Sequence, residues 1–98
     1  MKFTHSQLKE ILKGKEADLQ RFHVKSLFVF GSVARGEATD GSDIDFLVEF
    51  DCPVGMFEFL DLKYFLEDLL KQEIDLATRK ALHPRLKDNI LREAIRVA

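Results

Sequence analysis

Cysteine is nearly absent from this chain of 98 residues: Cys52 stands alone, so no internal disulfide can form. The three histidines are scattered along the chain, and no Cys/His spacing typical of a zinc site occurs. Because free cysteines usually behave as small hydrophobic residues, we expect Cys52 to have a purely structural role.

Long apolar runs and a basic excess are also missing. No apolar segment approaches the roughly 20 residues that a membrane helix needs, and the start of the chain lacks the apolar region of a signal peptide. We therefore expect a cytoplasmic protein without a membrane partner. The net charge is −2, from 15 basic and 17 acidic side chains. This balance disfavours a domain that grips long nucleic acid by itself.

What the chain does have is enough apolar residues for one core. Hydrophobic residues make up 46% of it, with nine Phe and no Trp, so phenylalanine should fill much of the interior. A length of 98 residues suits a single domain over residues 1–98.

The apolar pattern predicts alternating helices and strands. Short runs rich in β-branched and aromatic residues indicate strands, and apolar residues at helical spacing indicate helices. Gly14 is a weak point or a break in the first helix. The expected elements are a helix over 4–22, a strand Val24–Phe30, a short helix Ser32–Arg35, a strand Asp43–Phe50, a helix Met56–Lys71, a strand Glu73–Ala77 and a helix over 84–97. This α-β-α-β-α-β-α order predicts an α/β fold, a small mixed sheet of three or four strands packed with helices.

Two carboxylates stand two residues apart where the second strand is expected to start. Strand geometry sends Asp43 and Asp45 to the same side. Neighbouring carboxylates repel each other unless a cation or a proton lies between them. Magnesium is usually bound by one or two carboxylates together with substrate phosphates. The pair is therefore interpreted as a binding site for magnesium and the substrate phosphates.

A glycine–serine turn and a third carboxylate complement this pair. Gly31 follows the first expected strand and lets backbone approach a ligand closely, and Ser32 adds a hydroxyl donor beside N–H groups that favour anions. Asp75 lies in the third expected strand and would complete a two-metal site. Each feature alone usually marks an ordinary turn or a solvated carboxylate, but here they occur in the required order on the required elements.

The segment Gly31–Gly36 (GSVARG), five further residues and then Ser42–Asp45 (SDID) resemble the signature of minimal nucleotidyltransferases. These belong to the DNA polymerase beta-like superfamily, with kanamycin nucleotidyltransferase as a larger relative. The family's α/β core has the length of this chain. Its third carboxylate lies in an apolar-Asp-apolar strand, a short pattern that Ile74–Leu76 matches.

The resemblance implies a role for each candidate residue. Asp43 and Asp45 would hold two Mg²⁺ ions, and Asp75 would hold the catalytic ion and help deprotonate an acceptor hydroxyl. Gly31 and Ser32 would bind the triphosphate of the substrate, which by resemblance is ATP.

Two further residues of the signature have less definite roles. Ser42 would support the turn or contact a phosphate. Arg35 would either stabilise phosphate charge or pair with an acid such as Glu37, and the sequence does not decide between these.

The resemblance also implies a partner. Minimal nucleotidyltransferases are typically antitoxins that add AMP to a tyrosine of a HEPN-type ribonuclease toxin. The surplus apolar residues Phe57, Tyr64 and Phe65 fit either a helix that packs on such a protein or the domain's own core. Two other hypotheses stay open: an antitoxin that only binds, and an enzyme that modifies a small molecule such as an aminoglycoside. Homo- or hetero-oligomerisation also stays open.

Overall fold

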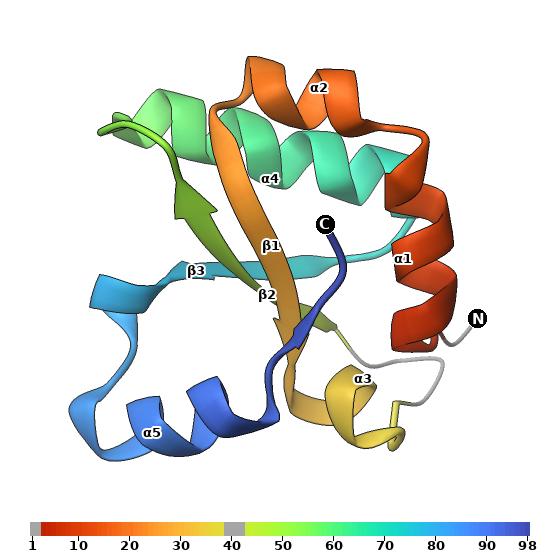
Figure 1. Ribbon diagram of the computed structural model, residues 1–98, viewed down its shortest axis with the longest axis vertical. Coiled ribbons are helices and arrows are strands. Elements are labelled where there is room, and N and C mark those ends of the chain that lie inside the picture. The colour runs from red at the N-terminus through yellow and green to blue at the C-terminus, as the bar shows by residue number, and fades with distance from the viewer. Residues whose placement is uncertain (1–2, 39–42) are drawn as a thin grey trace.

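The computed structural model describes residues 3–38 and 43–98, which form helices around one mixed sheet (Figure 1). The first half holds α1 (His5–Lys13), α2 (Glu16–Arg21), β1 (Val24–Phe30), α3 (Gly31–Arg35) and β2 (Ile44–Phe50). The second half holds α4 (Met56–Leu70), β3 (Ile74–Thr78), the 3-10 turn η1 (Arg79–Ala81), α5 (Pro84–Glu93) and β4 (Ile95–Arg96). The α/β fold predicted from the sequence is confirmed, with four strands in the sheet.

The N-terminal helical segment breaks into two helices at Gly14. Thr4 caps α1 through a reciprocal pair of hydrogen bonds with Gln7, so the helix starts where a capping box places it. Leu8 and Leu12 lie one turn apart on its buried face. Of the two readings of Gly14, the break is therefore the observed one.

The sheet has the strand order β3-β2-β1-β4. β1 runs antiparallel to both β2 and β4, whereas β2 and β3 are parallel and are connected through α4. Because side chains alternate along a strand, one face of the sheet is apolar and packs on α1, α2 and α4. The strand residues of this core are Leu27, Val29, Ile44, Phe46, Val48, Ile74 and Leu76. The residues between them, Asp45 and Asp75 included, point to the opposite face.

The predicted last helix is wrong at its C-terminal end. α5 stops at Glu93, and the chain then pairs with β1 as the short strand β4. The backbone N–H of Val97 donates to the carbonyl of Leu27 at 2.9 Å, and the N–H of Leu27 donates to the carbonyl of Ala98 at 3.0 Å. Val97 is buried and Ile95 is half-buried while Arg96 faces solvent, which fits the alternation of a strand better than a helical stripe.

Two smaller expectations also change. Asp43 lies just before β2 rather than inside it. Cys52 is exposed rather than packed as a small hydrophobic residue. In α4 the buried residues include Leu62, and Phe57, left open by the sequence, is exposed. No helix among the described residues is long and apolar enough to cross a membrane.

Candidate active site

Asp45 and Asp75 lie side by side on the face of the sheet opposite the main core. They are direct partners in the parallel ladder between β2 and β3. Such partners have Cβ atoms only about 5 Å apart, so the two carboxylates face the same small volume. The structure thus brings Asp75 next to Asp45, while its predicted role in a metal site stays a prediction.

Asp43 adds a third negative charge to this edge. It lies one residue before β2 and is exposed. Burial, followed by the charges of Asp75 and Asp43, raises the pKa of Asp45 from 3.8 to about 6. The positive charge of Arg35 acts in the opposite direction and lowers it. Three carboxylates therefore converge closely enough to disfavour ionisation of the central one.

Gly31 is held against the Asp45 carboxylate. It follows β1 directly, and Phe30 is the ladder partner of Asp45. Its φ of +70° lies in the left-handed region, and a Cβ built on it would collide with Asp45 Oδ2. Both facts require glycine at this position. The group that approaches Gly31 among the described residues is the Asp45 carboxylate, and the predicted close approach of a ligand stays a prediction.

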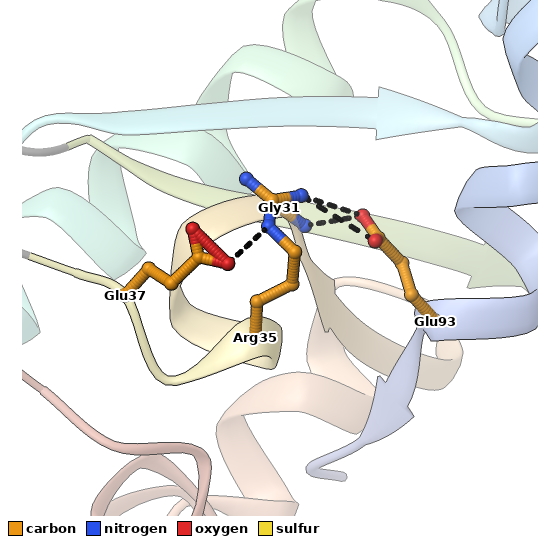
Figure 2. Close-up of polar contacts among 4 residues, drawn as sticks. All are labelled: Gly31, Arg35, Glu37 and Glu93. Atoms are coloured by element: carbon orange, nitrogen blue, oxygen red, sulfur yellow. Dashed lines mark hydrogen bonds and ion pairs between the residues drawn. The ribbon is translucent and has the colours of Figure 1, made fainter.

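Hydrogen bonds and ion pairs connect Gly31 and Arg35 of α3 to Glu37 and to Glu93 of α5 (Figure 2). Arg35 Nε donates to Glu37 Oε1 at 3.1 Å, and its Nη1 lies 3.3 and 3.4 Å from the two carboxylate oxygens of Glu93. The backbone N–H of Gly31 also donates to Glu93 Oε1, at 3.0 Å. The pairing of Arg35 with Glu37 is one of the two alternatives left open by the sequence.

Glu93 is a site residue that sequence reasoning missed. It is the last residue of α5 and is separated from Gly31 by 62 positions, so no local pattern links the two. Its side chain is 29% exposed and its charge also raises the pKa of Asp45. An open pocket of about 670 Å³ lies beside this network, lined among others by Phe30, Gly31 and Glu93.

The remaining candidates are the two serines. Ser32 is half-buried in the first turn of α3, next to Gly31. Ser42 lies outside the described residues, so its predicted contact with the turn or with phosphate stays a prediction.

The donor set suits Mg²⁺. Asp43, Asp45 and Asp75 offer only carboxylate oxygens, the hard ligands that this ion prefers. Burial first, and then the charges of Asp75 and Asp43, raise the pKa of Asp45, so its ionised form is disfavoured here. A divalent cation would relieve that repulsion, so these residues fit the metal that the sequence resemblance implies.

Comparison with known proteins identifies the family. The family model described as "Nucleotidyltransferase domain" matches residues 6–97. The chain belongs to this nucleotidyltransferase family. Protein adenylyltransferase MntA of Thermococcus cleftensis is 36% identical over 95 residues, with 96% of each chain covered. A solved structure whose name assigns it provisionally as a minimal nucleotidyltransferase matches with a TM-score of 0.79 and 36% identity, covering 95% of each chain.

A more distant likeness extends the fold comparison. The complex of tri-AMPylated Shewanella oneidensis HEPN toxin with an MNT antitoxin matches with a TM-score of 0.63 and 16% identity, covering 92% of this chain and 71% of the other. At this identity the likeness shows a shared fold.

Proposed function

We propose that this nucleotidyltransferase moves AMP from ATP to a hydroxyl of a partner protein. The observation that carries the proposal is the convergence of Asp43, Asp45 and Asp75 beside the Gly31 turn. The protein adenylyltransferase name of a relative covering 96% of the chain supports the same reaction class. Residues 1–98 would act as a single domain in the cytoplasm, where the nucleotide is available.

The chemistry is an in-line displacement at phosphorus. The acceptor hydroxyl oxygen forms a bond to the α-phosphorus of ATP, the bond from that phosphorus to the α,β-bridging oxygen breaks, and pyrophosphate leaves. Asp75, the more exposed of the two ladder partners, receives the hydroxyl proton. Asp43, Asp45 and Asp75 would hold two Mg²⁺ ions, which supply charge stabilisation of the attacking and leaving oxygens.

The α3 turn would bind the phosphates that leave. Ser32 offers its hydroxyl and Arg35 its guanidinium, a geometry suited to phosphate oxygens. Glu93 accepts a hydrogen bond from the N–H of Gly31 and pairs with Nη1 of Arg35. We propose that Glu93 competes with phosphate for these groups and gives up part of this contact when the triphosphate arrives. Ser42 would contribute to the same site, as the sequence resemblance implies.

The acceptor that fits best is a tyrosine of a HEPN-type toxin, with this chain as antitoxin. The distant structural match is a complex of a HEPN toxin modified with AMP and an MNT antitoxin. On this chain Phe57 is 84% exposed and Tyr64 is 57% exposed on α4, which suits a contact with another protein. Phe65, in contrast, packs on Phe22 with ring centroids 5.2 Å apart and belongs to the core.

Two other functions compete with this proposal. A catalytically idle antitoxin would bind the toxin without using the carboxylates, although binding alone does not require three converging acids. An enzyme acting on an aminoglycoside would need an acceptor pocket, which larger relatives build with a second domain.

One experiment separates the three. The protein is incubated with ATP labelled at the α-phosphate, Mg²⁺ and the product of the neighbouring gene, in parallel with an aminoglycoside. Label on the partner protein with wild type and none with Asp43→Ala/Asp45→Ala is the expected result. Neutralisation of the partner that survives the double substitution, without transferred label, would leave a binding antitoxin. Label on the aminoglycoside alone would establish a small-molecule enzyme.

A further inference from the structure

His23, Asp51 and Cys52 meet at the end of the sheet away from the aspartates. His23 precedes β1, and Asp51 and Cys52 follow β2. One ligand atom from each of the three lies within 4.8 Å of the other two. The candidate active site lies at the other end of the same ladder, where Phe30 pairs with Asp45. At about 3.3 Å per residue, the two ends are about 20 Å apart.

We propose that these three side chains form a second, chemically different cation site that takes Zn²⁺. A thiolate, an imidazole nitrogen and a carboxylate are the donor types that zinc accepts, normally in tetrahedral geometry with water as the fourth ligand when the protein supplies three. Mg²⁺ prefers oxygen donors alone. The donor sets therefore assign zinc to this end of the sheet and magnesium to the other.

The backbone holds the two ligand-bearing turns together. The N–H of Asp51 donates to the carbonyl of His23 at 2.9 Å, directly beyond the last ladder pair of Val24 with Phe50. His23 Nδ1 lies 3.9 Å from Asp51 Oδ1. Zinc bond lengths of about 2.0–2.3 Å place tetrahedral ligands about 3.4–3.6 Å apart. His23 and Asp51 thus need to close by about half an ångström, and no pair of the three ligand atoms, all within 4.8 Å of one another, needs to close by more than about 1.4 Å.

Glu58 supplies an orienting contact for the imidazole. Its Oε2 lies 4.0 Å from His23 Nε2, while His23 Nδ1 faces Asp51. In protein metal sites, a histidine that binds through one ring nitrogen usually donates its other N–H to a carboxylate, which fixes the tautomer and the ring orientation. Glu58 also accepts a hydrogen bond from the N–H of Gly55, so its carboxylate is anchored at the start of α4.

The backbone of His23 does not itself call for histidine. Its φ of +64° lies in the left-handed region, where glycine is the least strained residue. This provides an unusual test variant. His23→Gly should fold at least as well as wild type and yet lack the imidazole, so loss of metal binding in this variant cannot be ascribed to unfolding.

The test uses Co²⁺ as a spectroscopic substitute for Zn²⁺, with the protein kept reduced by a phosphine. Because Cys52 is the only cysteine, a thiolate-to-cobalt charge-transfer band in the near ultraviolet reports this site and not the aspartates. We expect the band to saturate at one equivalent of Co²⁺ per chain and to disappear when Zn²⁺ displaces the cobalt. Cys52→Ser and His23→Gly should abolish it.

Two further variants sharpen the result. Glu58→Gln should weaken Co²⁺ binding about 10- to 100-fold, as is usual for loss of an orienting carboxylate. His83→Gln, which removes a histidine elsewhere, should leave binding unchanged. Absence of the band in wild type would overturn the proposal. A band that persists in His23→Gly, or that saturates at half an equivalent per chain, would overturn it too, because the thiol would then bind metal without the imidazole or between two chains.

Discussion

Replacing Asp45 with asparagine should stabilise the metal-free protein at neutral pH. The pKa of the Asp45 carboxyl is raised from 3.8 to about 6 by burial and by the neighbouring Asp75 and Asp43. The folded state therefore binds this proton more tightly than the unfolded state does. The contribution of Asp45 to stability is fully present below pH 4 and is lost as the pH rises through 6. At pH 7.5 the ionised carboxylate opposes folding, and a neutral amide of the same shape removes that opposition.

The size of the effect follows from the pKa. One pKa unit corresponds to about 1.36 kcal/mol, so the full change corresponds to about 3 kcal/mol. Asp45 is only partly buried, and solvent screening reduces this value. We expect Asp45→Asn to gain about 1–2 kcal/mol at pH 7.5, which for a domain of this size raises Tm by roughly 4–16 °C.

Urea unfolding followed by far-ultraviolet circular dichroism, in EDTA at a series of pH values, measures this directly. The gap between Asp45→Asn and wild type should widen as the pH rises from about 4 to about 7. Mg²⁺ should stabilise wild type and not the variant. Asp68→Asn is the control, because the Asp68 side chain is 86% exposed and its charge is not among those that shift the pKa of Asp45, so its effect should stay within about 0.5 kcal/mol. A variant that is less stable than wild type at pH 7.5, or a gap independent of pH, would refute the argument and identify Asp45 as a structural carboxylate.

Three other substitutions test neighbouring parts of the account. Gly31→Ala should destabilise the protein by more than Gly36→Ala in thermal unfolding. Both glycines have φ near +70°, a conformation that costs an alanine about 1–2 kcal/mol of folding free energy. Of the two, only Gly31 would also bring its new Cβ against another group, the Asp45 carboxylate. Equal losses would show that the close approach is absent. Glu93→Gln should strengthen ATP binding roughly fivefold in calorimetry. Arg35 then no longer has to give up a partly exposed ion pair, which contributes about 1 kcal/mol, before it contacts phosphate. Weaker ATP binding would instead show that binding requires the Glu93 carboxylate. Phe57→Ser should change the free energy of unfolding in urea by no more than about 0.5 kcal/mol, because Phe57 is exposed. It should weaken binding of the partner protein by about 2 kcal/mol, the size of an interface hot spot. Unchanged affinity would show that the partner binds at another surface.

The sequence predicted most of the fold because its signals are local. The apolar run of β1, the alternation in β2 and the glycine after α3 are all contained within a few residues. β4 escaped prediction because it has only two residues, Ile95–Arg96, and is defined by its pairing with β1. A strand of that length has no periodicity of its own, so its residues were predicted as the end of the preceding helix.

In the candidate site, too, the residues with a local sequence signal could be predicted and those brought together by the tertiary fold could not. The spacing of Asp43 and Asp45 is local, and Asp75 could be found through a short apolar strand. Glu93 reaches Gly31 only through the tertiary fold, from α5. His23 and Cys52 are likewise separated by most of the β1–β2 unit, so their encounter has no spacing signature in the sequence. Contacts between segments that are distant in the sequence could be found only from the three-dimensional structure.

The central claim is that three carboxylates on one edge of the sheet transfer a nucleotide, and the fate of the label tests it most directly. The protein, Mg²⁺ and the partner protein are incubated with ATP labelled either at the α- or at the γ-phosphate, and released pyrophosphate is measured. The account predicts label on the partner from the α-position only, one pyrophosphate per label, and no transfer by Asp75→Asn. Transfer of the γ-label, or transfer that persists at the wild-type rate in Asp75→Asn, would contradict it.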